Sequence, residues 1–324
     1  MTLVFDEIHP HEKGFGAFFA DEIAPILDDV ESTRIEACKI FNQRLLICVL
    51  AAIPTAAALF VFSSIFFDSD VSDVTMGTLA IAIVGAVWWV NKPRKDFLIA
   101  FKHRILRPVA NFLSFHFWPD GRDFCTGFGE TGILHDHDER EFEDAFAGEH
   151  LGVDLNFEEV ELINVSRDSK GRKRRTTVFD GIAATIQMNK RFNGHTIVKE
   201  DRGKIGNWLI DSFNKMEAVA LEDPRFEDRF EVYSNDQVEA RYLLTPAFME
   251  RLYAVSQAFD DAKLRACFRD DRLYLLIPYR SDLFEAASLS KTVLDTDGLR
   301  KVLGQIESLR GIIDVLKLNE RLGL

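Results

Sequence analysis

The chain lacks the sequence features that usually announce an enzyme or a cofactor site. Its four cysteines are scattered through 324 residues with no CxxC spacing, which argues against a zinc site and a disulfide framework. No GxSxG elbow or Cys-His signature places a nucleophile. Gly127 and Gly129 have no strand before them, so they do not form a nucleotide-binding loop. We therefore expect no cofactor, and a binding module rather than an enzyme.

Basic charge is also scarce. The chain has 52 acidic and 39 basic residues and a formal net charge of −13 at pH 7, so as a whole it should repel nucleic acid. We expect no nucleic-acid partner. The first residues, MTLVFDEIHPHEKG, lack the basic start and apolar core of a cleavable signal peptide. Membrane insertion would therefore depend on a later segment.

Two runs without charge, 45–67 and 74–91, follow each other closely. A helix rises ~1.5 Å per residue, so the first run is long enough for a hydrocarbon core of ~30 Å. Pro54 lies inside it, and Trp88 and Trp89 at the end of the second suit a headgroup boundary. We predict a transmembrane helical hairpin over 44–91, joined by the acidic turn 68–73. The alternative is a buried helix pair of a soluble protein.

Basic residues flank both outer ends of this hairpin. By the positive-inside rule both termini are cytoplasmic and the acidic turn is outside. No ionisable side chain lies within either run, which argues against an ion conduit. The flanking basic residues are Arg34, Lys39, Arg44, Lys92, Arg94, Lys95, Lys102, Arg104 and Arg107.

Amphipathic helices are predicted on either side of the hairpin. Residues 1–43 contain an apolar face that includes Phe19, Ile23 and Val30. Residues 92–118 are expected to form a basic juxtamembrane helix, in which Phe97 and Phe101 begin an apolar repeat. This second helix either lies near anionic lipid or packs on the soluble domain.

Residues 119–324 alternate short strand-like and helical segments, which predicts a cytoplasmic α+β domain built around an antiparallel sheet. Period-two alternation near Val160 and Ile182 indicates neighbouring strands, separated by a polar loop. Thr245 and Pro246 predict a helix start. Alternation at 264–268 and 273–277 predicts a strand hairpin.

A C-terminal helix is predicted over 297–320. Its apolar residues follow spacings of three and four, the seam of a coiled coil. The stripe is either an interface for a partner or a second copy, or it docks on the sheet of its own domain. Its members are Leu299, Val302, Ile306, Leu309, Ile313 and Leu316.

Two polar clusters are candidate ligand sites. His135, Asp136 and His137 combine imidazole and carboxylate groups, which suit a divalent metal, although they also suit a plain hydrophilic loop. A basic loop would hold a phosphate or an anionic lipid headgroup, or else is a solvated hairpin tip. Its residues are Lys170, Arg172, Lys173, Arg174 and Arg175.

The stretch from Leu221 to Leu252, LEDPRFEDRFEVYSNDQVEARYLLTPAFMERL, resembles the bacterial membrane protein family catalogued as domain of unknown function 3137. The similarity continues from Phe268 to Phe284, and Phe179-Asp-Gly181 is similar to the family's Phe-x-Gly element. Two membrane spans ahead of the domain also fit. Because the family has no established activity, the resemblance assigns no catalytic residue.

The resemblance implies a membrane-associated assembly, since some members are encoded beside LemA-type membrane proteins. Asp236, Glu239 and Arg241 are the polar residues of the motif, and we expect them to cap and pair helix ends. The expected function is a scaffold that recruits a protein partner, a LemA-type protein or a second copy, to the inner membrane. The alternatives are a metal-dependent enzyme with a membrane-proximal substrate and an anionic-lipid sensor.

Overall fold

The computed structural model describes residues 3–65, 69–134, 136–167, 171–199, 216–259, 262–279 and 283–316. The chain divides into two compact units. The first comprises Met1–Pro108 and Glu285–Arg300, and the second comprises Val109–Phe284 and Lys301–Leu324.

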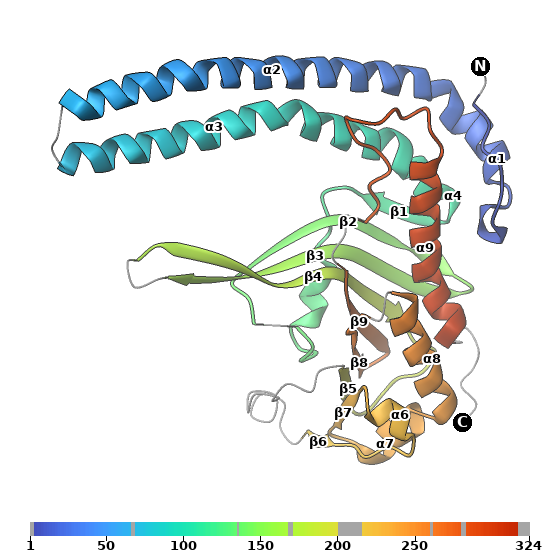
Figure 1. The fold of residues 1–324 in the computed structure, drawn as a ribbon. Helices are drawn as coiled ribbons and strands as arrows, with labels where there is room; N and C mark the ends of the chain where they lie inside the picture. Colours follow the sequence, from blue (N-terminus) through green and yellow to red (C-terminus); the bar gives the residue numbers. More distant parts are fainter. Residues whose placement is uncertain are drawn as a thin grey trace. The chain divides into compact units, whose positions relative to one another are not determined.

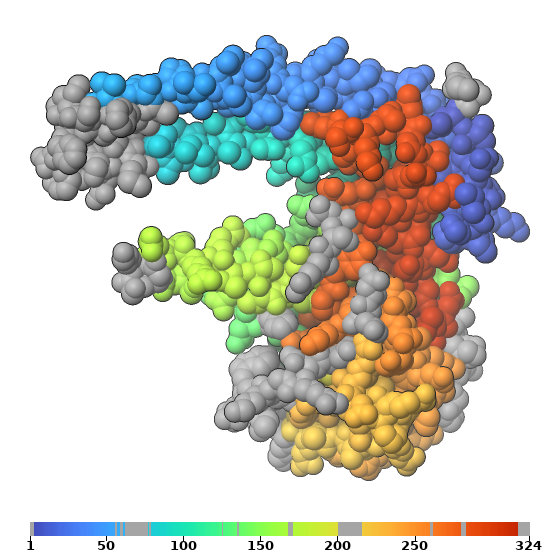
Figure 2. Space-filling view, in the orientation of Figure 1, coloured from blue at the N-terminus to red at the C-terminus, as the bar shows by residue number. Residues whose placement is uncertain are grey.

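The first unit is helical. Its two long helices, α2 and α3, lie side by side (Figures 1 and 2), and the Arg44 guanidinium joins them by donating to the Trp89 carbonyl oxygen at 2.7 Å. The helix continues through Pro54. In chain order the helices are η1 (Pro10–Glu12), α1 (Phe15–Phe18), η2 (Phe19–Ile23), α2 (Ala24–Ile65), α3 (Ser69–Phe101) and η3 (Lys102–Leu106). The next helix, α4 (Arg107–Phe112), belongs to the second unit from Val109 onward.

The predicted apolar face of residues 1–43 is confirmed as a buried stripe. Phe19, Ile23 and Val30 are each no more than 2% exposed. Phe5 packs edge-on against Phe15, with ring centroids 4.7 Å apart. This stripe is core of the first unit rather than a free amphipathic surface.

We call residues 3–14 the N-terminal hook and residues 285–300 the strap. Two polar contacts connect the strap to the rest of the first unit, one to the hook and one to α2. Glu12 is fully buried, accepts from the backbone N–H groups of Ile8 and His9 at 2.6 and 3.0 Å, and pairs with the Arg300 guanidinium. On α2, Arg34 donates to the Leu289 carbonyl oxygen at 2.6 Å. The strap, although more than 200 residues later in the chain, thus holds the N-terminal hook and α2 by side-chain contacts.

The second unit is organised around one antiparallel sheet, in which the described residues form nine strands in the order β1-β2-β3-β4-β9-β8-β5-β7-β6 (Figure 1). The strands are β1 (Phe115–Trp118), β2 (Glu139–His150), β3 (Val153–Arg167), β4 (Lys173–Gln187), β5 (Thr196–Lys199), β6 (Glu217–Ala218), β7 (Glu231–Ser234), β8 (Arg265–Arg269) and β9 (Arg272–Pro278). Phenylalanines such as Phe146 and Phe157, whose rings stack 4.7 Å apart, fill the core.

Gly181 allows the close pairing of β4 and β9. It lies opposite Pro278, and a Cβ atom there would come within 2.2 Å of the Ile277 carbonyl oxygen. No side chain fits at that distance. The Phe-x-Gly element therefore has a structural role in the sheet.

The helices of the second unit are η4 (Phe124–Phe128), α6 (Pro224–Glu227), α7 (Gln237–Leu243), α8 (Pro246–Ala258) and most of α9 (Asp297–Leu316). Three of them begin at a side-chain cap, which satisfies backbone N–H groups of the first turn. The caps are Asp223 for α6, Asp236 for α7 and Thr245 for α8.

Several sequence predictions are confirmed. The fold combines helices with an antiparallel sheet, the strands around Val160 and Ile182 are neighbours, and β8 and β9 form the predicted hairpin. The helix at Pro246 and the start of the C-terminal helix at Asp297 are also confirmed. That last helix is described to Leu316.

One predicted helix is wrong at its end. Residues 92–118 were expected to be helical throughout, but the helical segments end at Phe112 and Phe115–Trp118 form β1. The reason is the alternation of buried Phe115 and Phe117 with His116 and Trp118, which suits an edge strand beside β2. The second compact unit accordingly begins at Val109, before the boundary placed at residue 119.

The apolar character of the first unit is clearest in α2. Among the described residues, one helical stretch, Phe15–Thr55, is long and apolar enough to cross a membrane, and 6% of its most apolar window is buried. Of the predicted spans, Phe66 and Phe67 lie outside the described residues.

Candidate functional site

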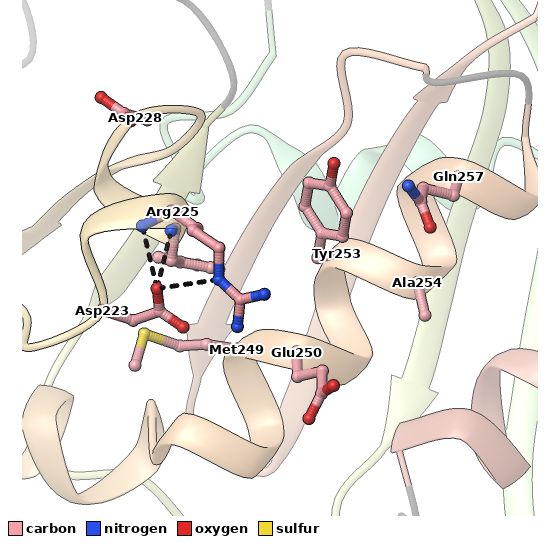
Figure 3. Close-up of a pocket in the computed structure, with 9 residues that line it drawn as sticks. Asp223, Arg225, Asp228, Met249, Glu250, Tyr253, Ala254 and Gln257 are labelled. Carbon is pink, nitrogen blue, oxygen red and sulfur yellow. Dashed lines mark hydrogen bonds and ion pairs between the residues drawn. The ribbon is translucent and has the colours of Figure 1, made fainter.

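A cavity of about 470 Å³ lies between α6 and α8, and we call it the α6–α8 cavity (Figure 3). Its volume falls in the range of ~300–1,000 Å³ typical of ligand sites. One wall comes from α6 and the residues around it, and the other comes from one face of α8. The lining residues are Asp223, Arg225, Phe226, Asp228, Met249, Glu250, Tyr253, Ala254 and Gln257.

The α6 side of the cavity is fixed by its helix cap. The Asp223 carboxylate accepts from the backbone N–H groups of Arg225 and Phe226 at 2.9 and 3.3 Å, and the Arg225 Nε lies 3.8 Å from the same oxygen (Figure 3). Phe226 and Met249, 3% and 2% exposed, form the apolar floor. The carboxylate is thus committed to the fold, while the Arg225 side chain is 88% exposed.

The α8 side offers polar groups that the fold does not use. Within the described part of the chain, the Glu250 carboxylate, the Tyr253 hydroxyl and the Gln257 amide form no hydrogen bond. The Tyr253 ring is held by the Arg229 guanidinium, 4.9 Å from its centroid, and Arg229 donates to the Ser256 hydroxyl at 2.5 Å. Of the three, Tyr253 is held in position by Arg229, and all three polar groups are available to a ligand.

The three motif residues lie outside this cavity and have structural roles. Asp236 accepts from the N–H groups of the first turn of α7, as expected of a cap. Glu239 accepts from the backbone N–H groups of Asn193 and Gly194 at 3.1 and 2.6 Å, so it holds these two residues in place. The Arg241 Nε is 3.5 Å from the Ala220 carbonyl oxygen.

The predicted metal cluster is only partly within the described residues, because His135 lies outside them. Asp136 is exposed and His137 is half-buried. Among the residues that the structure describes, no three His, Cys, Asp or Glu side chains come together in a way that would hold a metal ion. Metal binding by His135, Asp136 and His137 stays a prediction.

The basic loop lies at the turn between β3 and β4, as predicted for a hairpin tip, with Arg167 paired to Lys173. Its described residues are Arg172, Lys173, Arg174 and Arg175, all exposed, and Lys170 lies outside the described residues. Arg175 forms ion pairs with Glu141 and Glu139 at 2.5 and 3.1 Å. It therefore belongs to the strand ladder more than to the tip.

The predicted partner interface on the C-terminal helix is corrected by its burial. All six residues of the stripe, Leu299, Val302, Ile306, Leu309, Ile313 and Leu316, are at most 3% exposed. The chain itself covers them, so they offer no surface to a coiled-coil partner. On β2, His150 contacts both Asp314 Oδ2, 3.1 Å from Nε2, and Arg310, which donates to Nδ1 at 3.0 Å.

Two buried titratable residues of the second unit, Cys267 and His195, have the properties of structural residues. Burial raises the pKa of the Cys267 thiol, so the reactive thiolate is disfavoured. Burial also lowers the pKa of His195, whose Nε2 lies 2.9 Å from the Thr131 carbonyl oxygen. A neutral imidazole that donates to this carbonyl is a structural histidine.

The sequence contains one signal for the α6–α8 cavity that lies outside its recognisable motifs. Glu250, Tyr253, Ala254 and Gln257 have the spacing i, i+3, i+4, i+7 on the predicted helix, and this spacing defines one helical face. Phe248 and Leu252, on another face of the same helix, are buried in the core. The mixture of residue types on the cavity face resembles ordinary surface, so the sequence alone does not distinguish it from a solvated helical face.

Residues 177–318 match the model of a family described as "Protein of unknown function (DUF3137)". The resemblance drawn from the sequence is therefore confirmed over these residues, which include the whole lining of the α6–α8 cavity. No curated protein matches the chain. Among solved structures it is similar to the "crystal structure of the mycobacterial trehalose monomycolate transport factor A, TtfA", with 13% identity and a TM-score of 0.34 over 64% of this chain and 91% of that chain.

Proposed function

We propose that this chain, whose residues 177–318 carry the domain of unknown function, is a membrane-anchored module that presents a partner-binding domain at the cytoplasmic face of a bacterial inner membrane. The observation that carries the proposal is the exposed apolar surface of α2. Leu46, Leu50 and Ile53 are 57%, 62% and 74% exposed. Exposed apolar area on this scale is unfavourable in water and favourable in hydrocarbon.

The proposal extends to both long helices. On α3, Ile81 and Val84 are 74% and 69% exposed. The acidic residues at 68–73, between the two uncharged runs of the sequence, and the basic residues that follow the second run favour a two-span hairpin with both termini in the cytoplasm. The ring of Trp89, with the Arg44 guanidinium 4.8 Å from its centroid, suits the boundary between lipid and water.

Extraction and topology assays test the anchor. The chain should stay in the membrane fraction under alkaline carbonate and enter solution only with detergent. A phosphatase reporter, active only outside the cytoplasm, should be inactive after Leu324 and active after Asp70. Release by carbonate would overturn the anchoring, and an active fusion after Leu324 would overturn the orientation alone.

The binding partner in this proposal is a protein, either a LemA-type membrane protein or a second copy of the chain. The α6–α8 cavity supports it, because it is an open site with uncommitted polar groups. Crosslinking in native membranes should capture a specific species that depends on an intact cavity. A lone monomer in mild detergent, together with no crosslinked species, would contradict this part of the proposal.

A second candidate function is binding of anionic lipid by the β3–β4 tip. Arg167, Lys173 and Arg174 are exposed and, among the described residues, their side chains have no ion-pair partner. Each such residue contributes about 1 kcal/mol near an anionic surface. Full-length protein in neutral-lipid nanodiscs should therefore bind anionic-lipid beads at low salt, and Lys173→Gln with Arg174→Gln should weaken binding roughly 30-fold. Equal binding to neutral beads would refute it.

A further inference from the structure

The α6–α8 cavity is shallow, and its shape indicates the kind of ligand that it takes. Its floor, Phe226 and Met249, is buried, whereas Glu250, Ala254 and Gln257 around it are exposed. Sites for small molecules usually enclose most of the ligand surface. A shallow site of this kind suits one or two side chains that project from a larger partner.

The charge around the cavity is predominantly negative. Asp223, Asp228 and Glu250 line it, against the single cation Arg225. The surrounding sequence, 216–259, has nine acidic and four basic residues. Because Asp223 caps α6, Glu250 is the lining carboxylate that the fold leaves without a partner within the described chain. A cationic ligand is therefore complementary to this surface.

The exposed face of α8 adds polar recognition to the apolar floor. The Tyr253 hydroxyl and the Gln257 amide have no hydrogen-bond partner in the described part of the chain, and with Glu250 they have the spacing i, i+3, i+7 of one helical face. A hydroxyl and an amide can each donate and accept. They match the alternating N–H and C=O groups of a peptide backbone.

We propose that the α6–α8 cavity binds a short basic peptide segment of a partner protein, which places one apolar side chain against Phe226 and Met249 and a lysine or arginine beside Glu250. The peptide backbone lies along Tyr253 and Gln257. This inference rests on the proposed partner-binding function and gives the chemistry of the segment that is bound.

Fluorescence anisotropy with full-length protein in nanodiscs tests the inference. Three labelled peptides of equal length serve as probes: alternating lysine and leucine, lysine and glycine, and glutamate and leucine. The first should bind, and the other two should bind at least about tenfold more weakly, since one lacks the apolar anchor and the other the charge. Ala254→Trp, which fills the cavity from an exposed position, should weaken the first peptide about tenfold.

A matched variant separates the cavity from general attraction to an acidic protein. Ala247 is an exposed alanine on α8 that does not line the cavity, so Ala247→Trp should bind the first peptide as the wild type does. Glu250→Gln should weaken binding and reduce its dependence on salt. Equal binding by Ala254→Trp and the wild type, or equal binding of the glutamate peptide, would overturn the inference.

The membrane assays distinguish this inference from the proposed function. If carbonate extraction leaves the chain in the membrane and crosslinking captures a partner, but no peptide binds, the chemistry proposed for the bound segment fails and the module stands. If carbonate releases the chain while the lysine and leucine peptide still binds through the cavity, the anchoring fails and the site stands.

Discussion

Replacing Arg300 with methionine tests whether the strap holds the N-terminal hook in place. Glu12 is fully buried and receives two backbone N–H groups and the Arg300 guanidinium, which also donates to the Asp6 carbonyl oxygen at 2.8 Å. Removing the guanidinium leaves a buried carboxylate without its counter-charge. Methionine keeps much of the length of the side chain, so the change is mainly one of charge and hydrogen bonding.

The magnitude follows from the burial of the pair. Removing one partner of a buried ion pair costs about 3–5 kcal/mol. Glu12 keeps its two backbone donors, and the Arg300 side chain is 18% exposed, so the lower end, about 3 kcal/mol, is expected. That free energy corresponds to roughly a 100-fold faster hydrogen exchange of the Ile8 and His9 amides, which open when the hook detaches.

Hydrogen exchange followed by mass spectrometry on full-length protein measures this effect. The control is Arg104→Met in the same unit, which removes an ion pair with Asp29 whose side chains are 39% and 67% exposed. Exposed pairs contribute about 0–1 kcal/mol, so exchange in the hook should stay near the wild-type rate. If Arg300→Met changes exchange less than about threefold, or Arg104→Met changes it equally, the pair does not hold the hook.

Three further predictions concern pH and local backbone structure. Burial opposes ionisation of Glu12, but the N–H groups of His9 and Ile8 and the Arg300 guanidinium lower its pKa below 4.5. The Arg34 guanidinium likewise lowers the pKa of Glu31. The two ionised carboxylates therefore stabilise the folded state above pH 4.5, and this stabilisation is lost as the pH falls through their lower folded-state pKa values. Protection of the hook, corrected for intrinsic exchange, should therefore decline only in this acid range, and a decline near pH 6 would contradict it. Gly181→Ala should lower the free energy of unfolding by about 1–3 kcal/mol. Gly304 lies in a helix with open space around it, so Gly304→Ala should raise the free energy of unfolding by about 0.5–1 kcal/mol. Thermal midpoints that move in the same direction for both variants would refute this account. Asp236→Ala should lose about 1 kcal/mol in thermal unfolding while Asp236→Asn loses little, because asparagine also caps helices; equal losses would speak against the cap.

Helix starts and strand hairpins can be predicted from the sequence, because they depend on a few residues that are adjacent in the chain. Thr245 and Pro246 mark the start of α8 because the hydroxyl and the fixed proline φ both favour a first helical turn. Asp270 and Asp271 form the turn that joins β8 and β9, because aspartate favours turn conformations. In contrast, β1 has four residues and directly follows a helical segment. Its period-two pattern is too short to outweigh the preceding helical repeat.

Contacts between distant residues lie beyond this kind of prediction. The bond from Arg34 to the Leu289 carbonyl oxygen spans 255 residues, and neither residue has a neighbour that indicates the other. The α6–α8 cavity is similar, because Phe226 and Met249 come from separate elements. The sequence predicts the start of α8 from Thr245 and Pro246, but it predicts neither α6 nor the contact between the two helices. Only the packed structure shows which polar residues surround the space between them.

The C-terminal stripe and the apolar run of α2 show how coverage decides the function of similar sequence patterns. Both lie on helices rich in leucine, isoleucine and valine; the sequence predicts a partner interface for the stripe and a membrane span for the run. On α9, Ile306 and Ile313 are completely buried by the rest of the chain, so this stripe contributes to folding. On α2, Leu50 and Ile53 stay more than 60% exposed, so their apolar area is not used within the chain. Burial of apolar surface yields about 25 cal/mol per Å², and for these side chains of α2 this free energy can still be gained by transfer out of water. The length of the helix favours transfer into a bilayer over burial against a second protein.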